Sequence, residues 1–244
     1  MYISNNSANI AFTGPVSLKR ASFWDSRKTS SFEVEHPSLN TLNVSSHKLK
    51  KTHNDEFVSS VVNSANRILA TEKILINKSK HELYGCSIKT NERYRYNSLG
   101  EILRLSGIIT MFENKANKMR ICSIGDAAVF HAKYKFEPDI STPLDAEFML
   151  YRIADSKSKK YSQKAHEILN EYDFDKCDDE QLQNSANSLV KELLDDIVYN
   201  KYDYDRKDLK HWSLDMVLTK ENVLNNKEFF NNLYKKHGIE YEIN

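Results

Sequence analysis

The fold is decided by the stretch from Tyr84 to Pro138, which reads YGCSIKTNERYRYNSLGEILRLSGIITMFENKANKMRICSIGDAAVFHAKYKFEP. Its pattern predicts a strand over 83–88, a polar loop, a helix over 99–112, a strand over 119–124 and a short helix after Gly125. The whole chain has 6 Gly, and most of them lie in this window: Gly85, Gly100, Gly107 and Gly125. In a chain so poor in glycine, this grouping indicates backbone constraints or the close approach of a ligand.

The predicted helix over 99–112 is apolar on nearly every face. A surface helix would keep a charged side, so we expect this one to be buried against a sheet, with Gly107 permitting close approach. The strands before and after it are natural partners. A strand–helix–strand unit of this length is parallel and right-handed by strong default.

Periodicity predicts the elements that precede this unit. Apolar residues from Phe57 to Leu69 recur at steps of three and four after Asn54 and Asp55, which stand where an N-cap should be. We therefore expect an amphipathic helix of about four turns there. A strand over 72–76 would form an antiparallel pair with the strand over 83–88.

Beyond Pro138 the chain is expected to be mostly helical. Helices are predicted to start near Pro143, Tyr161 and Asp178, and the last is the clearest amphipathic helix of the chain. The C-terminal pattern predicts a strand over 212–219, a helix over 226–237 ended by Gly238 and a terminal strand over 239–243.

Composition suggests how these segments form domains. Residues 1–52 are rich in Ser, Asn, Lys and Thr, which favours a flexible N-terminal arm in which Ile10–Phe12 and Phe32–Glu35 could form short strands. Such a start is also seen in bacterial effectors with unstructured export signals. We expect a core domain at 53–140, a helical insertion at 141–210, and strands and a helix at 211–244 that complete the core.

Bulk properties exclude several classes of protein. The chain has 244 residues and 40% hydrophobic content, which is enough for a core, and its net charge of +1 does not point to nucleic acid. The 3 Cys lack metal-ligand spacing and cannot all pair within one chain, which favours a reducing compartment. No apolar run approaches the roughly 18 residues that span a bilayer. We expect a cytoplasmic protein without a metal, nucleic-acid or membrane partner, whose oligomeric state stays open.

The loop before the 99–112 helix holds candidate anion-binding residues. Backbone N–H groups at a helix start form an anion site without needing an acid or a base. Small residues at Ser98 and Gly100 would let a diphosphate come close, and Arg95 could add charge. An ordinary loop with a Ser/Gly helix start has the same spacing and remains the alternative.

This loop resembles the phosphate-binding signature of the GNAT superfamily of acyl-CoA-dependent N-acetyltransferases, Gln/Arg-x-x-Gly-x-Gly/Ala. Arg95-Tyr96-Asn97-Ser98-Leu99-Gly100 fits it, with Ser98 in place of the first Gly. A second signature of the family is an aromatic-rich helix that ends in a Tyr-x-x-x-Gly-Phe-like pattern. Residues 127–138 resemble it, with His131 at the Tyr and Lys135 at the Gly.

The resemblance implies an α/β (α+β) fold with a mixed, mostly antiparallel sheet flanked by helices and a helical insertion before the last strands. Acetyl-CoA, as cosubstrate, would lie in a splay between the strands at 83–88 and 119–124. Amides from Tyr96 to Glu101 would hold its diphosphate. The implied cofactor-binding residues are Cys86, Ile88, Arg95, Tyr96, Asn97, Ser98, Leu99, Gly100, Glu101, Ser123, Asp126 and Phe130.

The resemblance also implies a reaction, in which an amine of a small molecule or protein attacks the thioester directly. Backbone N–H groups near Cys86 to Lys89 would stabilise the oxyanion. Glu82 and Glu92 are candidate bases. His131 would replace the usual acid, since an unperturbed pKa of about 6.5 allows proton transfer near neutrality. A packed histidine is the alternative for His131.

A second function remains open from the sequence. The departures at Ser98, His131 and Lys135 also suit a non-catalytic interaction protein or effector that keeps the GNAT fold. Such a protein would bind a partner through its helical insertion.

Overall fold

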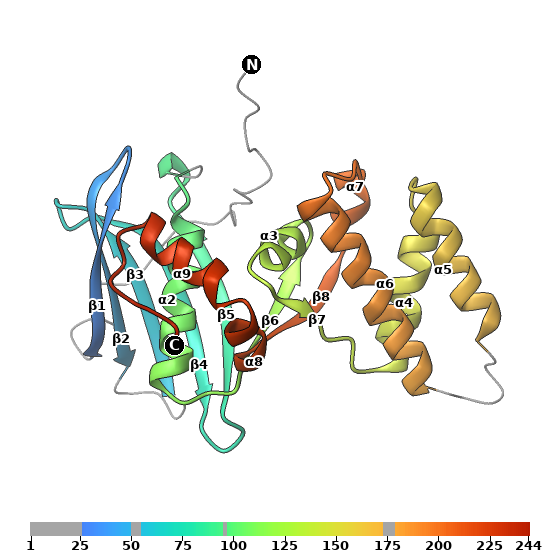
Figure 1. The fold of residues 1–244 in the computed structure, drawn as a ribbon, viewed down its shortest axis with the longest axis horizontal. Coiled ribbons are helices and arrows are strands. Elements are labelled where there is room, and N and C mark those ends of the chain that lie inside the picture. The colour runs from blue at the N-terminus through green and yellow to red at the C-terminus, as the bar shows by residue number, and fades with distance from the viewer. Residues whose placement is uncertain (1–25, 50–54, 95–96, 173–178) are drawn as a thin grey trace. The chain divides into compact units, whose positions relative to one another are not determined.

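The computed structural model describes residues 26–49, 55–94, 97–172 and 179–244 (Figure 1). The chain divides into two compact units. Unit 1 runs to Ile121 and includes Leu218–Asn244, and unit 2 is Cys122–Val217. The strands of the described part give a mixed, mostly antiparallel sheet with helices, so the predicted α+β class is confirmed.

Unit 1 is built on six strands in the order β1-β2-β3-β4-β5-β6. The pairs from β1 to β5 are antiparallel, and β5 pairs with β6 in parallel, so the predicted hairpin and the predicted parallel pair are both confirmed. The strands are β1 (Ser26–His36), β2 (Asn40–Leu49), β3 (Asp55–Val62), β4 (Ile68–Asn77), β5 (Glu82–Thr90) and β6 (Lys118–Ile124), which continues into unit 2 at Cys122.

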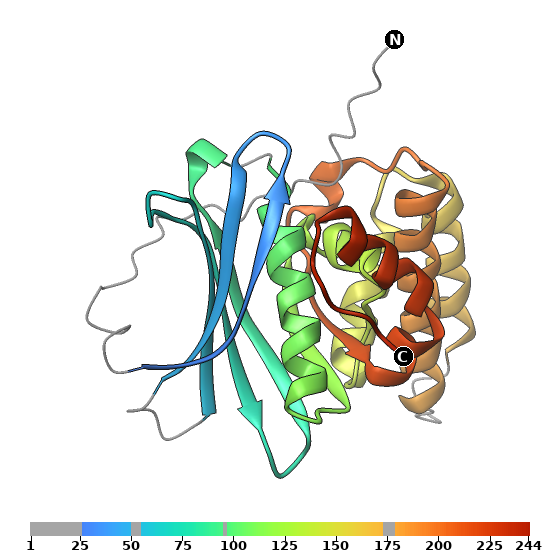
Figure 2. The same cartoon turned by 60° about the vertical axis from the view of Figure 1, so that its left-hand side comes forward.

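One buried helix covers a face of this sheet. Helix α2 (Leu99–Glu113) packs against β2, β3, β4 and β5, and every residue from Glu101 to Met111 is buried, as the apolar pattern predicts (Figure 2). The other helical segments of unit 1 are η1 (Glu92–Tyr94), α8 (Lys220–Asn225) and α9 (Lys227–Lys236), which ends before Gly238 at φ 64°.

Unit 2 is mainly helical, as the sequence predicts. Helix α4 packs against both α5 and α6, and α6 also contacts α3 and β7. Its elements are α3 (Ala127–Lys133), β7 (Glu137–Pro138), α4 (Pro143–Ala154), α5 (Lys159–Glu171), α6 (Asp179–Tyr199), α7 (Arg206–Leu209) and β8 (Ser213–Thr219), whose last two residues belong to unit 1. In the described residues, no helix combines the length and apolar character of a membrane span.

The helix predicted from Asn54 to Leu69 is wrong, because this segment forms β3 and the start of β4. Phe57 to Val61 are all buried, so both faces of β3 are covered and the alternation of a half-exposed strand is missing. The turn between the strands is held by Asn63, whose Oδ1 accepts from the amides of Ala65 and Arg67. A short apolar run buried on both faces therefore imitated a helical pattern.

The predicted strand over 239–243 is also wrong. Ile239 and Ile243 are buried, which explains the alternation, but the segment lies along α9 without joining the sheet. The Asn231 side chain bonds to the Ile243 backbone in place of a neighbouring strand. Its Oδ1 accepts from Ile243 N at 2.9 Å and its Nδ2 donates to Ile243 O at 3.1 Å.

The N-terminal segment differs from a loosely ordered arm where it is described. The predicted strand at Phe32–Glu35 lies within β1, and β2 pairs with both β1 and β3. Val34, Leu42 and Val44 are fully buried, so these strands contribute to the core of unit 1. The predicted strand at Ile10–Phe12 lies outside the described residues.

A buried ion pair joins α2 to the sheet. Arg104 Nη1 lies 3.0 Å from Glu72 Oε1 of β4, and both side chains are at most 2% exposed. Nη1 also donates to Met119 Sδ of β6 at 3.2 Å. Gly107 leaves room for the pair, because a Cβ there would stand 3.2 Å from Glu72 Oε2. Burial raises the pKa of Glu72 to about 7, although the Arg104 charge opposes this shift.

This raised pKa predicts a pH-dependent stability. The folded chain holds the Glu72 proton more tightly than the unfolded chain, so the contribution of Glu72 to stability is lost as pH rises from 4.5 to about 7. The unfolding free energy of Glu72→Gln minus that of wild type should therefore increase by about 3 kcal/mol as pH rises through this window.

Urea unfolding at several pH values measures this difference. Thr71→Ala, on the neighbouring position of β4, is the matched control and should differ from wild type by a pH-independent amount. A constant difference for Glu72→Gln would show that Glu72 ionises normally in the folded chain.

Candidate functional site

The start of α2 offers backbone donors at the position of the phosphate-binding signature. Ser98 is the N-cap, with left-handed φ 51° and ψ 18°, and its side chain makes no capping hydrogen bond. Ser98 O accepts from the amides of Glu101 at 3.0 Å and Ile102 at 3.2 Å. The amides of Leu99 and Gly100 belong to the first turn and have no acceptor within the helix. They can therefore donate to an anion.

The predicted cofactor-binding residues of this loop divide into three groups. Arg95 and Tyr96 lie outside the described residues. Asn97, Ser98 and Gly100 are partly exposed, whereas the Leu99 side chain is buried. Glu101 differs from the prediction in that its amide already has an acceptor.

The Glu101 side chain is buried and turned toward the C-terminal end of α9. Its Oε1 bonds to His237 Nε2 and, at 2.7 Å, to Lys236 Nζ. Lys236 offsets the charge of this carboxylate close to the helix start. The positive end of the α2 dipole therefore stays suited to an external anion.

A long-range contact holds the loop against the turn after β1. His36 Nε2 lies 2.8 Å from the carbonyl oxygen of Asn97, and Ser38 Oγ donates to Asn97 Oδ1 at 3.2 Å. Since a carbonyl only accepts, Nε2 carries the proton, and Nδ1 accepts from Ser38 N at 3.2 Å. Neither His36 nor Ser38 is indicated by the sequence, because a contact across 61 residues has no local signal.

Strand β5 contains a bulge at the predicted oxyanion position. Lys73 pairs with Ser87 and Ile74 with Gly85, so Cys86 is an extra residue opposite β4. The parallel pairing with β6 ends at Gly85–Ile121, while β5 continues to Thr90. A lone glycine inside a strand is a signal for such a bulge, and Gly85 is that signal in the sequence.

The residues around this bulge lie in different surroundings. Cys86 is exposed, and partial burial raises the pKa of its thiol. Ile88 is buried beneath α2 in register with Glu72. A Cβ on Gly85 would stand 2.9 Å from Ile121 Cγ2, so glycine permits the close approach of β5 and β6.

The candidate base Glu82 lies at the start of β5 in an ion-pair cluster. Its carboxylate lies 2.8 Å from Lys118 Nζ and accepts from Tyr84 Oη at 2.5 Å, and these two hydrogen bonds lower its pKa. A carboxylate held ionised in this way is a weak base. The geometry favours a structural role in the β5–β6 pair, and the catalytic role stays a prediction. Glu92 lies in η1 and is exposed.

Unit 2 holds the other predicted residues. Ser123 is fully buried, and its Oγ has no hydrogen-bond partner among the described residues. Gly125 follows β6 with φ 63°, and Asp126 is the N-cap of α3. Phe130 and His131 are buried on α3, where the His131 ring lies 5.1 Å from Phe130 and 5.6 Å from Phe136 by centroid. An aromatic surrounding encloses the imidazole.

In each of the two signatures, one residue stands where the family has glycine, and its backbone is left-handed in this chain. Ser98 has φ 51°, and Lys135 has φ 64°. Glycine adopts such φ values without steric cost, whereas other residues rarely do. The chain therefore retains the backbone conformation at these two positions although it lacks the glycines.

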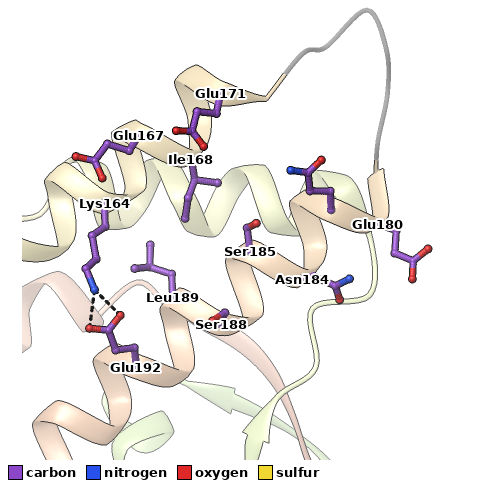
Figure 3. Close-up of a pocket in the computed structure, with 11 residues that line it drawn as sticks. Lys164, Glu167, Ile168, Glu171, Glu180, Asn184, Ser185, Ser188, Leu189 and Glu192 are labelled. Atoms are coloured by element: carbon purple, nitrogen blue, oxygen red, sulfur yellow. Dashed lines mark hydrogen bonds and ion pairs between the residues drawn. The ribbon is translucent and has the colours of Figure 1, made fainter.

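Unit 2 also has a groove that the signatures do not involve. It lies between α5 and α6 and has a volume of about 830 Å³ (Figure 3). Ile168 and Leu189 point toward each other at its floor, and Lys164 bonds to Glu192 at one end. Its charged lining is one lysine and four glutamates, a net charge of −3: Lys164, Glu167, Glu171, Glu180 and Glu192.

Comparisons with known proteins give matches among solved structures only. No protein-family model matches the sequence, and no curated protein does. The PaiA N-acetyltransferase of Thermoplasma acidophilum, in complex with coenzyme A, aligns at 12% identity and TM-score 0.31 over 35% of this chain and 54% of that chain. Nourseothricin acetyltransferase aligns at 13% identity and TM-score 0.31, over 47% of this chain and 73% of that chain. A GNAT-family acetyltransferase of Staphylococcus aureus aligns at 17% identity and TM-score 0.32, over 34% of this chain and 54% of that chain.

The chain thus spans about half the length of the first of these structures. The matched proteins are acetyltransferases at low identity, of the kind that the two signatures resemble. At these TM-scores the matches support no functional step, so a function for this chain has to be derived from its own residues.

The left-handed Ser98 generates a stability prediction. Ser98→Gly should raise the unfolding free energy by about 0.5 kcal/mol, because relief of the left-handed strain exceeds the added freedom of the unfolded chain and no capping bond is lost. Ser98→Ala keeps the strain and serves as the matched control. Chemical denaturation measures both, and a glycine variant less stable than the alanine variant would contradict the strained conformation.

Proposed function

We propose that this chain is an acyltransferase that moves an acetyl group from acetyl-CoA to an amine of a small molecule or protein. The observation that supports it best is local. The segment with the phosphate-binding signature folds as strand β5, a left-handed residue at Ser98 and the start of a buried helix with donors at Leu99 and Gly100. This arrangement suits a diphosphate.

The residues present fit the cosubstrate at two further points. Bound acetyl-CoA would supply an activated thioester. The bulge at Cys86 removes a residue of β5 from regular pairing with β4, which suits a main-chain donor to the thioester oxygen. Lys236, which pairs with Glu101, holds a positive charge close to the first turn of α2.

Proton transfer completes the proposed reaction. The attacking amine must lose a proton, and the departing thiolate must gain one. His131 can supply the second proton, because it occupies the position of the acid in the signature and an imidazolium is acidic enough near neutrality. The aromatic rings of Phe130 and Phe136 would hold its orientation. The base that accepts the amine proton stays unassigned.

A charge placed at the α2 start tests the diphosphate site. Gly100→Glu should weaken CoA binding by about a hundredfold or more, because a carboxylate would occupy the space and repel the diphosphate. Isothermal titration calorimetry with CoA measures this, supported by the CoA-dependent rise in melting temperature. Lys159→Glu is the matched control, since it also adds an acid to a helix start but lies in α5.

Each result has a separate meaning. If CoA does not bind the wild-type chain, the acyltransferase proposal fails. If CoA binds wild type and Gly100→Glu equally, the diphosphate lies elsewhere and the α2 assignment fails.

Replacing His131 tests the proton donor. His131→Phe should lower kcat by about a hundredfold while CoA affinity stays constant, because only the transfer of a proton is lost. Acetyl transfer to a panel of amines, followed across pH, measures this, and His166→Phe at an exposed position of α5 is the control. Wild-type rates at every pH would remove His131 from the reaction.

The second candidate function is a non-catalytic interaction protein. The observation that favours it is the acidic groove between α5 and α6, in a helical segment that the phosphate-binding signature does not need. Binding of CoA without acetyl transfer to any amine would favour this function, as would the absence of CoA binding.

A further inference from the structure

Helix α4 presents an apolar stripe to solvent. The described residues include five exposed large apolar side chains, and three of them, Leu144, Phe148 and Tyr151, lie on α4. They are 74%, 46% and 48% exposed. Their spacing of four and three residues puts them on one face, because α-helices have 3.6 residues per turn. Exposed apolar groups gathered in this way mark an interaction surface.

The inner face of α4 is already occupied. Ala146, Met149, Leu150 and Ile153 are buried, and α4 packs against α5 and α6. The stripe is therefore a second, outer face that the fold of unit 2 does not use.

One acid and one base flank the stripe on the same side. At about 100° per residue, Asp145 and Arg152 lie together beside the line through Leu144, Phe148 and Tyr151. The Arg152 guanidinium carbon lies 4.2 Å from the centroid of the Phe148 ring. Within the described residues Arg152 has no ion-pair partner, and its buried Nε has no hydrogen-bond acceptor. A carboxylate from outside can pair with this guanidinium, although not through the buried Nε.

We propose that the outer face of α4 binds α4 of a second copy of this chain, antiparallel and across a two-fold axis. In an antiparallel pair, the same side of both helices meets, so Asp145 faces Arg152 of the second copy and the reverse contact arises by symmetry. Phe148 meets Phe148 of the second copy near the axis, and Leu144 meets Tyr151. The surface is thus complementary to itself in both charge and shape.

A parallel pair is disfavoured by the same charges. It would bring Asp145 close to Glu147 of the second copy, and two carboxylates at one height repel each other. The interface is small, since a helix of 12 residues is about 18 Å long. We therefore expect a weak dimer with a dissociation constant of about 10–100 μM. This association is independent of acetyl transfer.

Sedimentation equilibrium of the full chain between about 2 and 200 μM tests the proposal, since this range brackets the expected dissociation constant. Wild type should pass from monomer to dimer. Phe148→Glu should be monomeric throughout. Arg152→Glu should weaken the dimer by about tenfold or more, because it opposes Asp145 of the second copy. Lys159→Glu, which changes the net charge equally on α5, should behave as wild type.

The charge-exchanged double variant decides the orientation. Asp145→Lys should weaken the dimer as Arg152→Glu does, and Asp145→Lys with Arg152→Glu should restore it to within about threefold of wild type, since the pairs re-form with reversed signs. Asp145 bonds to Thr142 at the N-cap, so circular dichroism should confirm that each variant is folded. A monomeric wild type, a dimer insensitive to Phe148→Glu, or no restoration would each overturn the proposal.

Discussion

The buried contact between Glu72 and Arg104 is the constraint on which the arrangement of unit 1 depends. It joins the middle of β4 to the middle of α2, and the Arg104 bond to Met119 extends it to β6. Glu72 keeps its proton up to about pH 7, and Arg104 stays buried beside it, where a charge left without its partner costs about 3–5 kcal/mol. The helix therefore has little freedom to slide or rotate on the sheet without separating the pair. Gly107 makes the close approach sterically feasible.

A helix held in this way can carry a functional end. Its first turn presents backbone donors at Leu99 and Gly100, and the loop before it is attached to β1 by the contact of His36 with Asn97. The bulge at Cys86 lies on β5, the strand that β4 pairs with and that α2 covers. Anion binding through main-chain groups needs an accurate backbone more than particular side chains. This explains how Ser98 can replace a glycine while the turn keeps its left-handed conformation.

Unit 2 uses its residues differently. Its α3 segment encloses His131 among aromatic rings, whereas α4, α5 and α6 form a helical group with charged and apolar features at the surface. Asp145 and Arg152 beside the α4 stripe, and the glutamates of the α5–α6 groove, are not part of the apolar core. Charged and aromatic groups in such places are commonly retained for recognition.

Elements with local signals can be predicted from the amino-acid sequence. The all-apolar α2, the parallel strands around it, the left-handed Gly238 after α9 and the helical run after Pro138 are recognised from patterns within a few residues. Strand β3 lacks such a signal, because burial on both faces removes its period of two. The alternating segment over 239–243 is not a strand, because its backbone bonds to the Asn231 side chain and not to a neighbouring strand. Three features are seen only in the folded chain: the contact of Glu72 with Arg104, the contact of His36 with Asn97, and the exposed outer face of α4. The physical reason is that these contacts join residues far apart along the chain, and their energies exist only once the strands and helices are neighbours.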